Sequence, residues 1–243
     1  MNGILRCSRY AFGPNRLHYC GPDANQELYS YIEHEAVDPG LELMLKQFKT
    51  MYPYLRLIAD ANKIRDAFDD RVVEAYWLGN NLLDQVDHRV FYTHLRDDHG
   101  LNRRLTMNDL ELVGQKIVQG AVPHHSYHVL DIWRQTGHQD RDVTLANMDA
   151  CRISWGQVTK VDGPFITVTT EPLILQDGKL ALGTATSKRL TRSLGAELDI
   201  EQLKPGDTVS IHWDVPCEVI TATQAAELKR RTISHIKLAN ATI

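Results

Sequence analysis

The chain has 243 residues, 43% hydrophobic and 24% charged, a composition typical of a globular protein with one large or two modest domains. A net charge of −4 and a pI near 6.2 argue against a general nucleic-acid-binding protein, because such proteins usually carry a basic excess. The N-terminus lacks the apolar segment of a secretory signal, and no run approaches the ~18 apolar residues that cross a membrane. We therefore expect a cytoplasmic protein that binds neither nucleic acid nor membrane.

The sequence contains four cysteines, Cys7, Cys20, Cys151 and Cys217. They show neither CxxC spacing nor the density of a disulfide-stabilised scaffold. In a reducing compartment we expect them to be free thiols or metal ligands.

Residues 24–149 show the periodicity of helices. Asp23 or Asn25 is expected to cap a first helix that runs to about residue 35. Pro39 suits the first turn of the next helix, and Pro53 is expected to break or kink it. Further helices are predicted at 55–67, 70–83, 87–96, 107–119, 124–135 and 142–149. Residues 1–23, rich in Gly, Pro and aromatic residues, are expected to be irregular and to pack on this helical module.

At Cys151 the pattern changes from helical to strand-like. Strands are predicted at 151–158, 165–170, 173–175, 180–182 and 208–213, with a hairpin turn at Asp177-Gly178. A helix over 223–237, capped by Thr221 or Thr223, follows. We therefore predict an α+β fold with two domains. Residues 1–149 form the helical module with its irregular N-terminal segment, and residues 150–243 form a small OB-like β-barrel with a C-terminal helix.

Two segments of this β-domain are similar to a known family. The sequence Cys-Arg-Ile-Ser-Trp-Gly-Gln-Val at 151–158 is followed by Lys-Pro-Gly-Asp-Thr-Val-Ser-Ile-His-Trp-Asp at 204–214 and then by the helix. In this order, residues 150–243 resemble the HypC/HupF family of NiFe-hydrogenase maturation chaperones. The family cysteine starts a strand near the chain terminus and Pro precedes the Gly, whereas Cys151 is internal and Trp155 takes the place of that Pro.

The resemblance implies a function as well as a fold. It implies a HypC-like barrel in which Cys151 and His212 bind iron, a metal that accepts both thiolate and imidazole ligands. It also implies that the iron carries CO and cyanide. The partners would be HypD-like maturation proteins or a hydrogenase large subunit, and the chain would be a chaperone or carrier of the iron precursor.

The resemblance leads to a geometric prediction. Metal–ligand bonds of roughly 2.0–2.3 Å bring a shared sulfur and imidazole nitrogen to within about 4 Å of each other. We therefore expect Cys151 and His212 to be neighbours. We also expect Cys151 to be at least partly accessible, because a carrier must hand over its cargo.

A second metal-binding pattern lies in the helical module. His124 and His128 are spaced i, i+4, so an α-helix would place both on one face. Further ligands would come from a set of histidines and carboxylates: His125, His94, His34, Glu33, Glu35 and Glu74. This reading makes the module a metalloenzyme of the non-haem iron type that supplies a small ligand to the barrel. The alternative is that these histidines are polar residues at a helix N-terminus.

Two further readings remain open. His18 and Cys20 lie in a segment dense in Gly, Pro and aromatic residues, and they would either ligate a metal or help to anchor a loop. In the last reading the protein has no chemistry, and it is a non-catalytic adaptor with the helical module as its docking platform.

Overall fold

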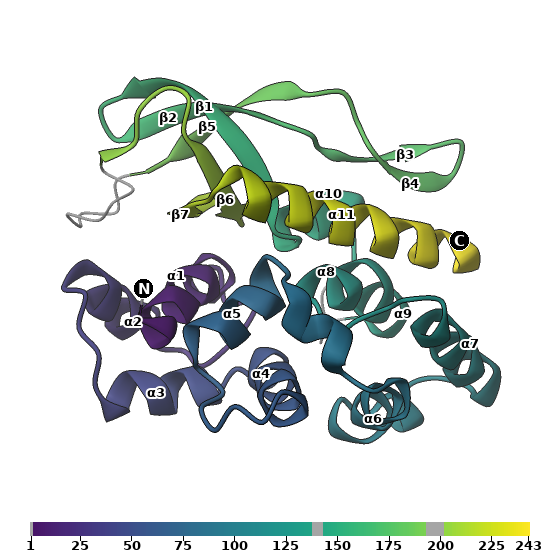
Figure 1. Cartoon of the computed structure of the whole chain (residues 1–243). Helices are drawn as coiled ribbons and strands as arrows, with labels where there is room; N and C mark the ends of the chain where they lie inside the picture. Colours follow the sequence, from purple (N-terminus) through teal and green to yellow (C-terminus); the bar gives the residue numbers. More distant parts are fainter. Residues whose placement is uncertain (1, 138–142, 193–201) are drawn as a thin grey trace.

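The computed structural model describes residues 2–137, 143–192 and 202–243. Helices fill most of the chain before residue 152, and strands and one long helix follow (Figure 1). The helices are α1 (Gly3–Arg16), α2 (Asn25–Glu33), α3 (Pro39–Lys46), α4 (Met51–Ala61), α5 (Asp70–Trp77), η1 (Asn81–Gln85), α6 (His88–Thr93), η2 (His94–Asp98), η3 (Leu101–Arg103), α7 (Met107–Val118), α8 (His125–Tyr127), η4 (His128–Trp133), α9 (Arg134–Thr136), α10 (Leu145–Cys151), α11 (Ala222–Ala239) and η6 (Asn240–Thr242). The predicted α+β class is confirmed.

The strands form an antiparallel sheet and a separate hairpin. They are β1 (Ser154–Asp162), β2 (Phe165–Thr170), β3 (Leu173–Gln176), β4 (Lys179–Leu182), β5 (Thr186–Thr191), β6 (Thr208–His212) and β7 (Val215–Val219). The sheet has the order β5-β2-β1-β6-β7, and β3 pairs with β4 across the predicted Asp177-Gly178 turn. Its edge strands β5 and β7 approach each other, but no ladder joins them among the described residues. The sheet is therefore open rather than a closed barrel.

The N-terminal segment is a helix, so the prediction of an irregular segment over residues 1–23 is wrong for most of its length. Asn2 caps α1 by accepting hydrogen bonds from the backbone N–H groups of Ile4 and Leu5. Gly13 and Pro14, which suggested a turn, lie in the last turn of this helix. A Cβ at Gly13 would lie 2.6 Å from the carbonyl oxygen of His212. The glycine thus permits close contact between α1 and β6, and burial of the helix outweighs its weak helix propensity.

Buried polar groups also fix α1 against the sheet. Arg6 in α1 donates to Glu218 in β7 over 2.9 Å, and Tyr10 donates its hydroxyl to the same carboxylate over 2.6 Å. Arg6 also pairs with Asp70 and Glu74 of α5, at 3.2 and 3.1 Å. A charge buried in this way is tolerated only when it is paired and hydrogen-bonded. The network therefore specifies one orientation of α1 between α5 and β7.

The first strand begins later than expected. Cys151 is the last residue of α10, and β1 starts at Ser154, so the prediction that Cys151 begins a strand is wrong. The sequence of α10, Leu-Ala-Asn-Met-Asp-Ala-Cys, contains good helix formers and is capped by Thr144. The change of period therefore occurs just after Cys151.

The helical layer and the sheet share a core. One continuous cluster of buried hydrophobic residues includes Tyr10 and Trp77 from the helices and Ile211 and Cys217 from the sheet. The long helix α11 lies between the sheet and the helical layer (Figure 1). The division into two domains at residue 150 stays a prediction. The core shows that the two parts are closely packed against each other.

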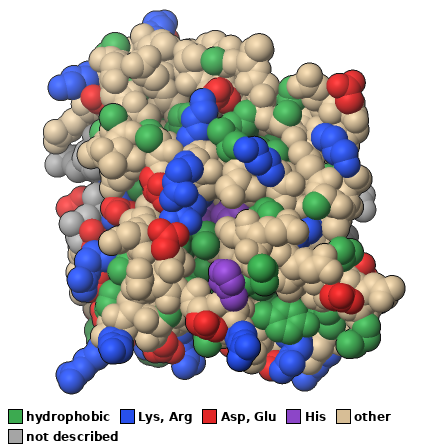
Figure 2. Space-filling model, turned by 45° about the vertical axis from the view of Figure 1, so that its right-hand side comes forward, with side chains coloured by type: hydrophobic (Ala, Val, Ile, Leu, Met, Phe, Trp, Pro, Cys, Tyr) green, Lys and Arg blue, Asp and Glu red, His purple; other side chains and the backbone are tan. Residues whose placement is uncertain are grey.

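The surface has a mixed character. On the face drawn in Figure 2, acidic and basic side chains are interspersed with hydrophobic ones, and histidine side chains are visible near its centre. None of the described helices is both long and apolar enough to cross a membrane.

Candidate metal centre

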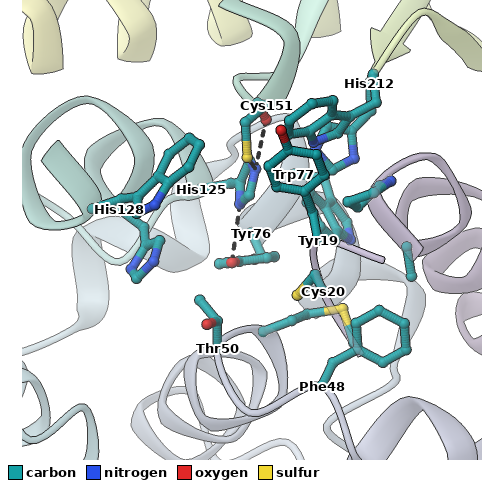
Figure 3. A pocket seen from close by; sticks show the side chains of 15 residues that line it. Tyr19, Cys20, Phe48, Thr50, Tyr76, Trp77, His125, His128, Cys151 and His212 are labelled. Atoms are coloured by element: carbon teal, nitrogen blue, oxygen red, sulfur yellow. Dashed lines mark hydrogen bonds between the residues drawn. The ribbon is translucent and has the colours of Figure 1, made fainter. Parts of the chain in front are cut away.

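Three side chains meet where the helical layer contacts the sheet. His125 comes from α8, Cys151 from the end of α10 and His212 from the end of β6 (Figure 3). One ligand atom from each lies within 4.8 Å of the others, and this is the only such group of three among the residues described. Cys151 and His212 are thus neighbours, as predicted, and Cys151 is half-buried.

A tight turn positions His212 and Cys151 relative to each other. Strands β6 and β7 are joined through Trp213 and Asp214, which both have positive φ angles, 50° and 62°. Such a two-residue turn matches the twist of an antiparallel pair, although Gly, Asn or Asp usually occupies these positions. The backbone N–H of Trp213 donates to the carbonyl of Ala150 over 2.8 Å. The turn therefore binds the end of α10, directly before Cys151.

The His212 ring is oriented for ligation. Its Nδ1–H donates to the carbonyl oxygen of Tyr10 over 2.7 Å, which leaves the lone pair on Nε2. That Nε2 atom is buried and has no hydrogen-bond partner among the described residues. A metal-bound histidine typically donates its other ring N–H to a carbonyl or carboxylate in this way.

His125 is held between two partners. Its Nε2–H donates to the carbonyl oxygen of Cys151 over 2.8 Å, and Nε2 lies 3.9 Å from the Cys151 Sγ atom. Its Nδ1 accepts from the hydroxyl of Tyr76 over 3.1 Å. A tyrosine hydroxyl can donate or accept, so Tyr76 can hold either tautomer of the ring. For His125 to ligate through Nε2, that atom must lose its proton and its bond to the Cys151 carbonyl.

Burial decides the charge of all three groups. It lowers the pKa of His212 to about 4 and that of His125 well below the ordinary value, so both rings are neutral near pH 7. It raises the pKa of the Cys151 thiol above its ordinary value, so this thiol is protonated when no cation is near. A metal ion reverses that preference, since a coordinated thiol is deprotonated. The site is thus neutral by itself and suited to a cation.

A small cavity adjoins the three side chains. Its volume is about 50 Å³, and aromatic and sulfur-containing side chains, among them Trp77, Trp213 and Cys20, line most of it (Figure 3). A larger cleft of about 830 Å³ shares Tyr19, Cys20, Thr50, His128 and Trp133 with this cavity, so the two spaces adjoin. The Tyr19 and Trp213 rings pack at the shared wall, with centroids 4.1 Å apart. The metal-ligand group therefore faces an apolar space beside a cleft.

Comparison with known proteins gives a family but no activity. A family model described as a family of unknown function matches residues 1–243. The chain belongs to the DUF6390 family. Neither the curated proteins nor the solved structures gave a match. The resemblance to the HypC/HupF family stays a hypothesis.

The i, i+4 pair His124 and His128 does not form a shared site. His124 caps α8 with an extended backbone (φ −107°, ψ 146°), so its side chain is not part of the helical face that begins in the next residue. Its Nδ1 bonds the Ser126 hydroxyl, and its ring packs beside His235 with centroids 5.8 Å apart. His128 packs beside Tyr54, whose hydroxyl lies 3.2 Å from its Nδ1. The prediction that one helical face presents both histidines is therefore wrong.

The carboxylates proposed as further ligands have other partners or positions. Glu35 pairs with Arg9 at 3.3 Å, and Glu74 pairs with Arg6 and accepts from Gln224. Glu33 lies 4.0 Å from His34 at the end of α2. None of the three belongs to a group of three converging ligands in the described part of the chain. Among the residues described, the structure thus does not bring the predicted carboxylates together with His124 and His128.

His18 and Cys20 separate in the structure. His18 is an exposed surface residue, and its Nδ1 lies 3.2 Å from the Asp23 carboxylate. Cys20 lines the cavity that the metal-ligand group faces, and burial raises the pKa of its thiol to about 11. It lies outside the group of three ligands but shares their space.

Sequence reasoning missed the groups that orient the ligands. Tyr10 acts through its backbone carbonyl, which no residue type reveals. Tyr76 lies in the predicted helix over 70–83, but helical periodicity does not show where a hydroxyl at the end of a ring will point. His99 and His235, which pack against the predicted histidines, carried no spacing signal.

Proposed function

We propose that the chain binds one iron ion through His125, Cys151 and His212 and acts as an accessory protein in NiFe-hydrogenase maturation. The convergence of these three side chains is the observation that supports it. A set of two imidazoles and one thiolate suits iron, zinc or copper, and the resemblance to HypC selects iron among them. In this proposal the open sheet with α11 is the counterpart of the HypC barrel.

The surroundings support small ligands on the iron. Three protein ligands leave coordination positions open, and the adjoining apolar cavity of about 50 Å³ has room for molecules of a few atoms. CO and cyanide are of this size. The iron unit would be cargo, taken from or passed to a HypD-like maturation protein or a hydrogenase large subunit.

Anaerobic purification with iron tests the proposal. We expect about one iron per chain in the wild type, and infrared bands of CO and cyanide if the cargo is complete. Cys151→Ser and His212→Gln should each lose most of the iron. Cys217→Ser is the matched control, because this thiol is buried nearby but donates only to the Val215 carbonyl, a bond that a serine hydroxyl can keep.

The outcomes separate the alternatives. Full iron content in Cys151→Ser would contradict the proposal. A wild-type protein that binds no metal but forms a stable complex with another protein would favour the adaptor reading. Iron without infrared bands would keep the metal site but remove the CO and cyanide ligands.

A further inference from the structure

A second group of histidines surrounds Tyr54, away from the three ligands described above. The rings of His94, His99 and His128 lie with centroids 5.3, 4.5 and 5.6 Å from that of Tyr54. The His94 and His99 centroids are 4.8 Å apart, and those of His99 and His128 are 5.7 Å apart. His99 and His128 line the large cleft. The three imidazoles thus surround one tyrosine ring, and two of them, His99 and His128, lie at the wall of the cleft.

Two ring nitrogens in this group are buried without a partner. The Nε2 atoms of His94 and His99 have no hydrogen-bond partner among the described residues, and His94 is only 5% exposed. An unsatisfied buried polar atom costs about 1–3 kcal/mol, and native structures contain few of them. Two such atoms on packed neighbouring rings at this position are available to a ligand.

A carboxylate orients one of these rings. The Nδ1–H of His94 donates to Asp98 over 2.7 Å, which places its lone pair on the buried Nε2. A carboxylate that holds a histidine in this way is typical of metal sites. Burial lowers the pKa of His94 and lowers that of His99 to about 2, so both rings are in the neutral form that binds metal.

The backbone gives an independent indication. Two π-helical segments occur in the described chain, η2 (His94–Asp98) and η4 (His128–Trp133), and each begins at a histidine of this group. π-helical turns are rare and are found frequently at functional sites, where they redirect side chains. His94 and His128 thus each lie at the start of an uncommon backbone turn.

We propose that His94, His99 and His128 bind a second divalent transition-metal ion at the wall of the cleft. Imidazoles that share one metal through nitrogen bonds of about 2.0–2.1 Å have ring centres roughly 5 Å apart. The spacings of 4.8 and 5.7 Å are close to this. Ligand atoms of the three rings do not all lie within 4.8 Å of one another in the structure, so metal binding requires the rings to turn. Imidazole nitrogens select ions such as Zn²⁺, Fe²⁺, Co²⁺ or Ni²⁺ over Mg²⁺ or Ca²⁺.

The proposed second ion would lie close to the first site. His128 lines both the cleft and the small cavity beside Cys151. An ion held by this group therefore lies next to the inner cavity. The proposal concerns residues other than the three inner ligands and does not depend on what those bind.

Titration of the full-length, untagged protein with cobalt(II) under anaerobic conditions tests it. We expect two equivalents to bind, one with the near-ultraviolet charge-transfer band of a thiolate ligand and one without it. His94→Gln and His99→Gln should each remove the equivalent that lacks the band and keep the other. His88→Gln, an exposed histidine of the neighbouring α6, is the control and should still bind two.

A milder substitution tests the same site with less risk that the variant fails to fold. Asp98→Asn keeps all three rings, and Asp98 is 64% exposed, so the fold should survive. We expect it to weaken the second equivalent by about 10- to 100-fold and to leave the thiolate band unchanged. The proposal would be overturned if the wild type bound only an equivalent with the thiolate band, or if the equivalent without that band survived in both His94→Gln and His99→Gln. A wild-type protein that binds one equivalent without the thiolate band would instead count against the inner site.

Discussion

His235 shows how one buried histidine links stability to pH. It is fully buried, its Nδ1 lies 2.7 Å from the Ser126 hydroxyl, and burial lowers its pKa from 6.5 to about 3. The unfolded chain therefore takes up a proton first as the pH falls. The stability that depends on neutral His235 is fully present above pH 6.5 and is lost between pH 6.5 and about 3.

This gives a prediction for His235→Gln, in which the amide replaces the imidazole without titrating. The pH dependence of the unfolding free energy should become shallower by up to about 1.4 kcal/mol per pH unit below pH 6.5. Urea unfolding at several pH values between 7 and 5 measures this slope. His88→Gln, at an exposed position, should leave the slope unchanged. An identical slope in the wild type and His235→Gln would show that His235 does not titrate on unfolding in this range.

The side chain and the backbone of Tyr10 have different roles, the first in stability and the second in metal binding. Its hydroxyl bonds Glu218 and Ser210, at 2.6 and 2.8 Å, whereas its carbonyl orients His212. Tyr10→Phe should destabilise the fold by about 1–3 kcal/mol, because a buried carboxylate loses a donor. It should keep the metal stoichiometry, since the carbonyl is unchanged.

Chemical denaturation and metal analysis of the same Tyr10→Phe preparation check both parts of this prediction. Tyr31→Phe is the comparison, because that hydroxyl bonds the exposed Asp38 and its loss should cost little. A folded Tyr10→Phe protein without metal would show that the hydroxyl network, rather than the carbonyl, supports the site.

At the level of elements, the contact of α1 with the β6–β7 turn limits residue size. Gly13→Ala would place a methyl group 2.6 Å from the His212 carbonyl oxygen and 3.2 Å from the Trp213 Cβ. We expect a loss of about 1–3 kcal/mol in stability and weaker metal binding, because His212 must move with its strand. Thermal unfolding and metal titration measure the two effects.

The matched control for Gly13→Ala is Gly114→Ala in α7. A Cβ there would make ordinary contact with Tyr92 at 3.5 Å. This helical position should gain about 0.4–1 kcal/mol. If Gly13→Ala were equally stabilising, α1 and the turn would not be in close contact in solution.

Helices with clear caps were predictable from the sequence, whereas helix α1 was not. Thr106 and Thr221 form capping boxes at the starts of α7 and α11, where the sequence predicted helix starts. Helix α1 was missed because Gly13 and Pro14 favour a turn locally, and only burial against the sheet outweighs them. The open form of the sheet also depends on long-range packing that short strand patterns do not encode.

One part of the candidate site was likewise predictable from the sequence and another part was not. The meeting of Cys151 and His212 followed from motif order, which survives a small error in where the strand begins. The third ligand, His125, could not be predicted from the sequence, because the choice among His124, His125 and His128 depends on helix register. His124 caps the helix and His128 begins a π-helical segment, so the regular 3.6-residue period fails at both ends of α8.

At the scale of the whole molecule, we expect a single unfolding transition. The core is continuous between the helices and the sheet, and the ion pair of Arg6 with Glu218 joins them. Tryptophan fluorescence and far-ultraviolet circular dichroism should therefore give coincident urea curves. Two separate transitions would instead support two domains that fold independently, as the change of periodicity near residue 150 first suggested.

The wide spacing of the inner ligands along the chain sets an order of events during protein synthesis. His125 and Cys151 leave the ribosome well before His212, and β6 must then pair with β1 to bring His212 into place. A nascent chain that has reached only Cys151 holds two of the three ligands and lacks the Trp213 turn that fixes the end of α10. The ion would therefore be acquired late, after the sheet has formed, and metal occupancy would report on completed synthesis and folding.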